Sequence, residues 1–314
     1  MSDAGPRDEM VRPRDAMVRI DGGEFTMGSD AFYPEESPTH RVTVSTFSID
    51  AHPVTNRQFR EFVDATAHVT TAEHPPRAED YPGARPELLV AGSAVFVPTA
   101  GPVDLRNPGQ WWTYAPGADW RHPTGGGSSI DDKADHPVVH VTYDDALAYA
   151  TWAGKSLPTE AQWEYAARGG LDGMPWAWGP EQRVDGDVPA NVWRGDFPWR
   201  ADAAHGWGTV PVGRYAPNGY GLYDMCGQVW EWTTDWWQPE HEPKGACCAP
   251  KVDPTGPVEA RFDPHAPSIA QRVLKGGSYL CADTYCMRYR PSARIAESVD
   301  TSTCHLGFRC VRVS

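Results

Sequence analysis

Two cysteines, Cys281 and Cys286, lie five positions apart in the stretch GGSYLCADTYCMRYR, which spans residues 276–290. Glycine, aromatic residues and arginine dominate this stretch, so it differs from an ordinary core segment. Two thiols at this spacing could form a disulfide, hold a metal ion, or simply fill space in the interior. The stretch by itself leaves these three readings open.

Cysteine usage along the chain weakens the disulfide reading. The seven cysteines are an odd number and all lie from residue 226 onward, whereas a secreted disulfide framework is denser and usually even. The N-terminal residues lack the apolar segment of a secretory signal, and no segment approaches the roughly 18 apolar residues of a membrane span. We therefore expect a cytoplasmic protein with no membrane contact. The adjacent Cys247 and Cys248, in GACCAP, could form a strained redox-sensitive bond.

Charge and composition restrict the class of protein further. The formal net charge of −14 argues against nonspecific nucleic-acid binding, which depends on cationic side chains against phosphate. It is compatible with a basic peptide partner. Thirty glycines, thirty prolines and fourteen tryptophans predict a loop-rich fold in which aromatic side chains supply much of the buried area. We expect residues 1–16 to be a disordered lead-in and residues 17–314 to form one domain.

Regular elements are expected in a few places only. Three helices are predicted where a threonine precedes a capping-box partner by three positions, at Thr55, Thr142 and Thr159. Two short strands are expected around Gly22 and Gly23, and a further strand in HRVTVSTFSID, residues 40–50. Residues 66–135 and 170–270 show turn signals but little periodicity. Such long irregular stretches need something to pin them, which a bound metal could do.

Four motifs carry a resemblance to a known family. In LPTEAQWEYAARGG, PNGYGLYDMCGQVWEWTTDWW, KGGSYLCADTYCMRYRPSAR and HLGFRC the sequence resembles the formylglycine-generating enzyme family, the sulfatase-activating enzymes. GGEFTMGS and HPVTNRQFREFV fit the opening of that family, so the resemblance covers roughly residues 17–312. The helix and tryptophan motifs mark the wider superfamily. The cysteine pair within GGSYxC…YCxRYR marks the catalytic branch and is much more specific.

The resemblance implies a fold and an activity. The fold is a single, mostly irregular α+β domain related to C-type-lectin-like folds, with bound calcium. The activity is the O₂-dependent oxidation of a cysteine to Cα-formylglycine in an unfolded sulfatase polypeptide that bears the motif Cys-x-Pro-x-Arg.

In that family the two thiols bind Cu(I), which implies that Cys281 and Cys286 are copper ligands. Thiolates are soft ligands that suit Cu(I), and two protein ligands leave the metal open to the thiolate of the substrate. The neighbouring Arg288 and Arg290 are expected to lower the thiol pKa values by favouring the charged form.

Two hydroxyl residues, Ser278 and Tyr285, occupy the family's positions near the reacting centre, where they could orient O₂. The alternative is that Ser278 satisfies backbone groups in a Gly-Gly-Ser turn and that Tyr285 belongs to the core.

The resemblance also implies one calcium site, at Asp224, Gly227, Val229 and Glu231. Two carboxylates and two backbone carbonyls would form an oxygen cage suited to a hard cation. Glu231 lies between two tryptophans, which is a costly place for an uncompensated charge. The alternative is a pair of surface carboxylates on a tryptophan-rich turn.

A second calcium site is less well matched. Asn191, Val192 and Trp207 fit the family's positions, but His205 stands where the family has aspartate. Imidazole is a poor calcium ligand, and Asp202 could replace the aspartate only if the loop bends. The family's turn also often has asparagine where this chain has Gln228.

Other functions remain as alternatives. A noncatalytic peptide- or ligand-binding paralogue would be expected to lack the cysteine pair. An iron-dependent sulfoxide synthase would need a further N-terminal helical domain, for which residues 1–16 leave no room. His136 and His140, in HPVVH, are spaced like helical ligands, but proline and valine between them favour a strand. Cys304 and Cys310 are expected to be packed free cysteines, although Cys304 could be a third thiol near the site.

Overall fold

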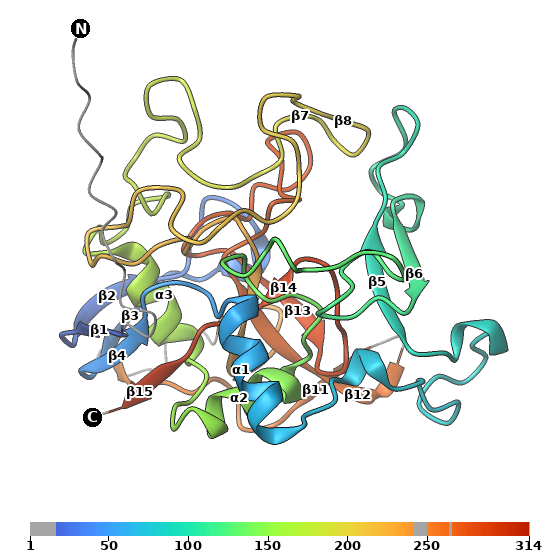
Figure 1. Cartoon of the computed structure of the whole chain (residues 1–314). Helices are drawn as coiled ribbons and strands as arrows, with labels where there is room; N and C mark the ends of the chain where they lie inside the picture. The colour runs from blue at the N-terminus through green and yellow to red at the C-terminus, as the bar shows by residue number, and fades with distance from the viewer. Residues whose placement is uncertain (1–16, 242–249, 264–265, 314) are drawn as a thin grey trace, which may run out of the picture.

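The computed structural model describes residues 17–241, 250–263 and 266–313. Short strands and helices are separated by long irregular connections, and the fold is α+β as the sequence predicts (Figure 1). The predictions for residues 1–16 and for Cys247 and Cys248 lie outside the described residues. Within the described part of the chain, no helix has the length and apolar character needed to cross a membrane.

Each of the three predicted helices begins at a threonine that closes a capping box. Thr55, Thr142 and Thr159 each accept a hydrogen bond from the backbone N–H three residues later, and the side chain at that position accepts one in return. These reciprocal bonds satisfy amide groups that the start of a helix leaves unpaired. Gly169 ends the third helix at φ 56°, in the left-handed region that glycine favours. The helices are α1 (Asn56–Thr66), α2 (Tyr143–Trp152) and α3 (Glu160–Arg168).

The central sheet is built mainly from strands that the sequence did not predict. Strand β12 pairs antiparallel with β9, β11 and β13, and β14 adds in parallel to β9. The register places Lys275 of β12 opposite Glu231 on one side and Arg294 on the other. Because most of β9 is buried on both faces, its sequence lacks the alternation that marks a half-exposed strand. The strands are β9 (Trp230–Trp236), β11 (Arg261–Asp263), β12 (Ala266–Lys275), β13 (Arg294–Ser298) and β14 (Leu306–Gly307).

Residues 40–50, predicted as one strand, form two strands that belong to different sheets. Strand β3 pairs with β2 and β10, whereas β4 lies between β1 and β15. The chain turns at Ser45, whose N–H and hydroxyl donate to the two carboxylate oxygens of Asp253 at 2.7 and 2.5 Å. The interruption between β3 and β4 therefore coincides with a contact to a residue more than 200 positions away, and no local sequence pattern reveals that contact. The strands are β1 (Met17–Ile20), β2 (Gly23–Met27), β3 (His40–Val44), β4 (Phe47–Asp50), β10 (Lys251–Val252) and β15 (Val311–Val313).

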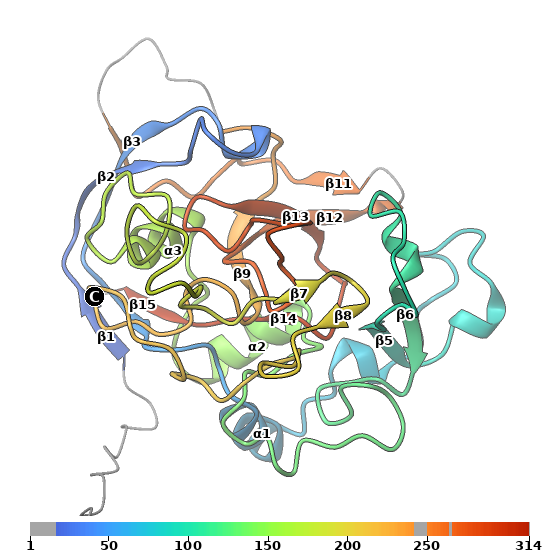
Figure 2. The same ribbon diagram turned by 90° about the horizontal axis from the view of Figure 1, so that it is seen from above.

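Two further hairpins lie in stretches for which the sequence predicted no elements. Strands β5 and β6 form a hairpin on the side of the molecule opposite α3, and β7 and β8 form a smaller one (Figures 1 and 2). Backbone hydrogen bonds tie β5 to the C-terminal segment, since Cys304 N–H donates to the Ala94 carbonyl at 3.2 Å. The elements are β5 (Gly92–Phe96), β6 (Trp112–Pro116), β7 (Gly195–Asp196), β8 (Arg200–Ala201) and the 3₁₀ turns η1 (Pro34–Glu36), η2 (Thr71–Glu73), η3 (Pro86–Leu88) and η4 (Pro108–Gln110).

The segment HPVVH, residues 136–140, belongs to no named strand, so the strand prediction is wrong. His140 itself has φ 60°, which interrupts an extended conformation. The two histidine rings contact different partners: His136 Nδ1 lies 2.9 Å from the Thr209 hydroxyl, and His140 Nδ1 lies 2.7 Å from the Ser93 hydroxyl. These contacts agree with the expectation that the histidine spacing is structural.

The largest core cluster joins the helices, the central sheet and the cysteine stretch. Phe59 of α1 and Tyr149 of α2 stack with ring centroids 6.0 Å apart. Trp232 of β9 and Leu274 of β12 belong to the same cluster, and so does Cys281. One of the two predicted site thiols is therefore fixed to the main core.

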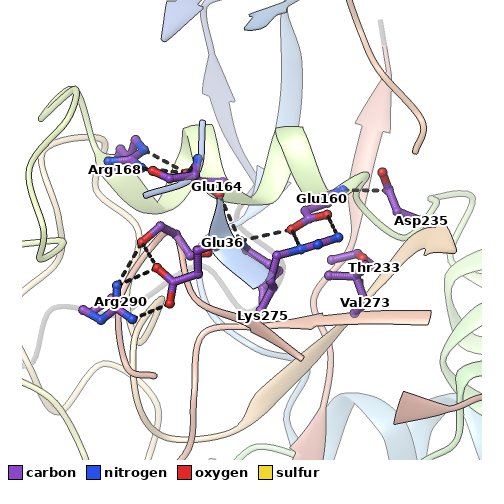
Figure 3. A network of polar contacts seen from close by, with 12 residues as sticks. Glu36, Glu160, Glu164, Arg168, Thr233, Asp235, Val273, Lys275 and Arg290 are labelled. Carbon is purple, nitrogen blue, oxygen red and sulfur yellow. Dashed lines mark hydrogen bonds and ion pairs between the residues drawn. The ribbon is translucent and has the colours of Figure 1, made fainter. Parts of the chain in front are cut away.

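A network of buried ion pairs joins α3 to the central sheet (Figure 3). Lys275 Nζ lies 2.9 Å from Glu164 Oε2 and 3.4 Å from Glu160 Oε1. Glu160 also accepts two hydrogen bonds from Arg294, at 2.7 and 2.9 Å, and Glu164 pairs with Arg168 at 2.7 Å. Burial raises the pKa of each glutamate, but the nearby cations outweigh it and lower both pKa values to about 2. Both carboxylates therefore stay ionised inside the protein.

A second buried ion pair joins η1 to the segment that follows the cysteines. Arg290 and Glu36 form a bidentate pair in which both side chains are fully buried, and the Ser292 hydroxyl donates to Glu36 Oε2 at 2.9 Å. Lys275 directly precedes the cysteine stretch, and Arg290 ends it. Buried ion pairs therefore hold the chain at both ends of the two-thiol turn.

We expect Glu160→Ala to lower the free energy of unfolding by about 3–5 kcal/mol, because it leaves Arg294 and Lys275 buried with less compensation. Urea denaturation measures this change. Because the folded-state pKa of Glu160 lies below its ordinary 4.5, its contribution is present above pH 4.5 and is lost as the pH falls toward 2. Asp21→Ala, which removes the exposed pair with Arg19, is the control and should leave the urea midpoint nearly unchanged. Equal midpoints for the two variants would contradict the anchoring role.

Candidate active site

The cysteine stretch leaves the central sheet through a turn that requires two glycines. Gly276 and Gly277 have φ values of 96° and 72°. A Cβ at these positions would lie 2.9 Å from the Met225 carbonyl oxygen and 2.8 Å from the Arg288 carbonyl oxygen. Any other residue would be strained and would meet backbone atoms that cannot move aside easily. The glycine pair therefore allows the chain to fold closely onto its own neighbours.

The two predicted thiols meet beyond this turn. The sulfur atoms of Cys281 and Cys286 lie 3.4 Å apart, which is hydrogen-bond contact and far longer than a disulfide bond of about 2.05 Å. Both cysteines are free. Cys281 is only 2% exposed, whereas Cys286 is partly exposed. Cys286 N–H donates to the Ala282 carbonyl at 2.8 Å and closes the turn between the thiols.

The two thiols differ in acidity because their surroundings differ. Burial raises the pKa of Cys281 well above its usual range, and its hydrogen bond with Cys286 acts in the same direction. The same hydrogen bond lowers the pKa of Cys286, and the positive charge of Arg288 lowers it further. The pair therefore favours a thiolate at Cys286 that accepts a hydrogen bond from the Cys281 thiol.

The two flanking arginines lie in different settings. Arg288 lies over the Tyr33 ring at 3.8 Å and pairs with Glu35 Oε1 at 2.5 Å. Arg290 is fully buried against Glu36 and anchors the chain. Arg288 lowers the pKa of both thiols, as predicted, whereas Arg290 is not among the strongest influences on either thiol.

The two predicted hydroxyl residues lie in different settings. Ser278 is buried, and its hydroxyl accepts a hydrogen bond from Leu280 N–H at 3.2 Å, which is the turn-forming alternative. Its own N–H points to Cys281 Sγ at 3.4 Å. Tyr285 is 38% exposed and stacks on Phe197 with ring centroids 4.6 Å apart. Tyr285 is therefore the exposed end of an aromatic cluster rather than a core residue.

Glu231, a predicted calcium ligand, has protein partners for both carboxylate oxygens. Its Oε2 accepts hydrogen bonds from Arg309 Nε and Trp163 Nε1, each at 2.7 Å, and its Oε1 accepts one from Arg309 Nη2 at 2.9 Å. Arg309 therefore compensates the buried charge. The cost expected for an uncompensated charge between two tryptophans is therefore met by a protein cation.

The other predicted calcium residues lie in the turn before β9. Asp224 Oδ2 accepts a hydrogen bond from Gly213 N–H at 2.6 Å. Gly227 packs so tightly that a Cβ there would lie 2.5 Å from the Asn191 carbonyl oxygen, and Val229 is buried. The structure thus brings the two predicted calcium-binding segments together.

Gln228, which replaces the family's asparagine, joins these two segments. Its N–H donates to the Asn191 carbonyl at 2.8 Å, and its Oε1 accepts from Asn191 Nδ2 at 2.6 Å. Its Nε2 donates to the Val210 carbonyl at 2.6 Å. The departure from the family's pattern therefore forms a structural cross-link.

The other residues of the predicted second calcium site differ in exposure, and Val192 is buried. Trp207 is 44% exposed and packs edge-on against Phe96. Asp202 Oδ1 accepts from Ala204 N–H at 2.7 Å and lies 3.6 Å from His205 Nδ1, so it caps its own turn. Among the residues that the structure describes, no three His, Cys, Asp or Glu side chains gather as a metal site.

Cys304 and Cys310 are packed, free cysteines, in agreement with expectation. Cys304 Sγ accepts a hydrogen bond from Phe96 N–H at 3.3 Å inside an aromatic cluster. Cys310 N–H donates to Asp50 Oδ2 at 2.9 Å. Cys304 therefore bonds to β5 and serves packing.

Further residues that contact the two-thiol turn carry no signal in the sequence. Tyr33 accepts a hydrogen bond from Met287 N–H at 3.1 Å, and Glu35 holds Arg288. Residues 182–183 contact the turn from the other side. These residues lie in loops about 100 or more positions from the cysteines, and no local pattern marks them.

Residues 3–314 match a family model described as the sulfatase-modifying factor enzyme 1-like domain, and the chain belongs to this family. The formylglycine-generating enzyme of Mycobacterium tuberculosis is 55% identical over 299 residues, which cover 94% of this chain and 97% of that protein. The formylglycine-generating enzyme of Thermomonospora curvata is 46% identical over 302 residues, which cover 94% and 92%. These relatives confirm the predicted family and the predicted class of enzyme.

Two further comparisons define the breadth of the family and the fold. A Mus musculus protein named inactive C-alpha-formylglycine-generating enzyme 2 is 37% identical over 319 residues, which cover 97% of this chain and 88% of that protein. The solved structure of PvdO from Pseudomonas aeruginosa has a TM-score of 0.62 at 24% identity and covers 95% of this chain and 94% of that one. The latter likeness concerns the fold alone.

We expect iodoacetamide to alkylate Cys286 at least ten times faster than Cys281, because Cys286 is the partly exposed member with the lowered pKa. Peptide mapping by mass spectrometry after short exposures at neutral pH measures both rates. The buried Cys304 provides an internal reference for slow modification. Equal rates for Cys281 and Cys286 would contradict the asymmetry of the pair.

Proposed function

We propose that this chain converts a cysteine of an unfolded sulfatase polypeptide into Cα-formylglycine. The observation that carries the proposal is the pair of free thiols 3.4 Å apart, held by the motif of the family's catalytic branch. Relatives that cover nearly the whole chain bear the name of this activity, which supports the same assignment.

The proposed reaction balances with an external reductant. The side chain CH₂–SH, O₂, two electrons and two protons give the aldehyde CHO, H₂S and water. Two of the four electrons that O₂ takes up come from the substrate carbon, and the other two come from a thiol reductant. The C–S bond breaks and the sulfur leaves as H₂S.

We propose Cys281 and Cys286 as ligands of one Cu(I) ion. Two thiolates are the donor set that suits Cu(I), and sulfurs 3.4 Å apart can both contact one ion. When bound, the copper would supply a position for the substrate thiolate and the reactivity toward O₂. The lowered pKa of Cys286 favours the ligand form at neutral pH.

The protein would act on the substrate through the surroundings of the thiols. Cys286 is the partly exposed member of the pair and follows Tyr285, whose side chain is also exposed, so an extended polypeptide could approach from that side. The Tyr285 hydroxyl is the group proposed to orient O₂, and Ser278 supports the turn that holds Cys281. The Cys-x-Pro-x-Arg motif is the proposed recognition element, because an arginine can form charge-assisted bonds to carboxylates in an acidic protein.

A noncatalytic role is the competing assignment, because the family includes a relative named as inactive. The retained cysteine pair favours the enzyme. Separate structural partners for His136 and His140 give no support to an iron site of the sulfoxide-synthase type.

We expect protein loaded with Cu(I) to oxidise a synthetic peptide containing Cys-Thr-Pro-Ser-Arg in the presence of air and a thiol reductant. Mass spectrometry should show loss of sulfur and gain of an aldehyde. Cys281→Ser and Cys286→Ser should each abolish the product and the one-equivalent binding of Cu(I), because a single thiolate cannot replace the pair.

Cys304→Ala is the matched control, a cysteine outside the pair, and should retain the activity if thermal melting shows it is folded. A peptide with alanine in place of arginine should react at least ten times more slowly. Near-normal activity in either serine variant would refute the two-thiolate assignment.

We also propose one calcium ion at Asp224, the carbonyl oxygens of Gly227 and Val229, and Glu231. A carboxylate has about four lone-pair sites. The three hydrogen bonds to Glu231 leave one site on Oε1 for an ion. At the second position, His205 stands where an aspartate would be needed, and imidazole is a poor calcium ligand. We therefore restrict the calcium proposal to the first site and leave out Asn191, Val192 and Trp207.

Removal of calcium with EDTA should lower the melting temperature, because the turn before β9 would lose the cation that balances Asp224. Differential scanning calorimetry with and without EDTA measures the shift, and elemental analysis should find one calcium per chain. Asp224→Asn should lose most of its sensitivity to EDTA. Unchanged melting and absence of co-purified calcium would exclude the site.

A further inference from the structure

The turn between the two thiols is fastened to a distant loop by one acidic side chain, Asp283. Its Oδ2 accepts a hydrogen bond from Arg183 Nη2 at 2.5 Å, and its Oδ1 accepts from Gln182 Nε2 at 2.8 Å. The Tyr289 hydroxyl also donates to Oδ1, and it lies 2.7 Å from Gln182 Nε2. Three side chains thus converge on a carboxylate that lies two residues after Cys281 and three before Cys286.

The loop that supplies Gln182 and Arg183 is itself supported. Trp178 Nε1 donates to the Glu181 carbonyl at 2.9 Å, and Trp178 stacks on Trp176 with centroids 5.7 Å apart. Trp176 in turn contacts the Tyr289 ring at 5.2 Å. The aromatic stack therefore connects the loop to the segment after the thiols. It supports the loop whose residues bond to Asp283.

The ion pair contributes little to global stability. The side chains of Asp283 and Arg183 are 36% and 49% exposed, and exposed pairs of this kind stabilise proteins only weakly. The ion pair matters because of its position between the two thiols in the sequence. Cys281 is fixed to the core, so the distance between the sulfurs depends on where the turn from Ala282 to Tyr285 places Cys286.

We propose that Asp283 is a positioning residue, which with Arg183 and Gln182 holds Cys286 at the spacing that a shared thiophilic ligand requires. Without the contacts of Asp283, the turn would sample other conformations. A ligand that binds both sulfurs would then have to restore the native conformation, which lowers its affinity. The inference rests on the proposed function only for the identity of the metal. The spacing of the thiols can be tested without copper and without catalysis.

The test uses phenylarsine oxide, which condenses with two thiols to form two As–S bonds and releases water, without oxidation or reduction. We expect Asp283→Ala to weaken the affinity for phenylarsine oxide and for Cu(I) by about five- to tenfold, because preorganisation is lost in both cases. The alkylation rate of Cys286, which needs only one thiol, should change less than twofold. The melting temperature should remain close to that of the unmodified protein.

Arg183→Ala tests the same contact from the other loop and should also weaken both affinities, but by less than Asp283→Ala, because Gln182 and Tyr289 still bond to the carboxylate. The double variant should be no weaker than Asp283→Ala alone, because Asp283→Ala already removes the contact with Arg183. Asp283→Asn keeps an oxygen acceptor for Gln182 but loses the charge that pairs with Arg183, so its affinity should lie between those of Asp283→Ala and the unmodified protein. Asp21→Ala, in an exposed ion pair at β1, is the matched control and should bind both ligands as the unmodified protein does.

The positioning role is refuted if Asp283→Ala and Arg183→Ala both bind phenylarsine oxide within twofold of the unmodified protein. A loss of affinity accompanied by an equal loss of Cys286 alkylation would refute it as well, since that result means altered exposure of the thiol. Weakened arsenical binding in a protein that never oxidises the peptide would support the positioning role and refute the proposed function. The two hypotheses can therefore fail separately.

Discussion

Buried ion pairs at both ends of the two-thiol turn are the interaction on which the site depends. Lys275, at the start of the turn, pairs with Glu160 and Glu164 of α3. Arg290, at its end, pairs with Glu36. Breaking such a pair is strongly destabilising, because it leaves a charge buried without compensation. An irregular segment between these anchors can therefore hold a fixed conformation without being part of a helix or a sheet.

This anchoring allows two chemically similar residues to differ. Cys281 belongs to the core, where burial keeps its thiol protonated, and Cys286 lies at the edge beside Arg288. Cys281 therefore gives the site a fixed position, and Cys286, which is partly exposed, is the member of the pair nearer to solvent. Such an arrangement suits a reaction in which a third thiol, from the substrate, must approach the pair.

The same principle of local compensation explains the acidic turn before β9. Glu231 is buried among tryptophans but bound by Arg309, and Gln228 links its turn to Asn191. Protein contacts therefore already supply much of the order that an ion would otherwise provide. Any calcium held by Asp224 would add to a turn that is largely assembled, so its effect belongs to stability rather than to the thiol chemistry.

The sequence by itself determined the features that depend on neighbouring residues. The capping threonines of α1, α2 and α3, the strands on either side of Gly22 and the glycines before Ser278 all follow from local backbone preferences, and the cysteine motif indicated the family. Tertiary structure alone decided the features that depend on distant partners. Asp253 bonds to Ser45 between β3 and β4, Glu36 pairs with the buried Arg290, and Arg183 pairs with Asp283 of the thiol turn from 100 positions away. Each is an interaction between segments that meet only after folding, so no local spacing or periodicity encodes it.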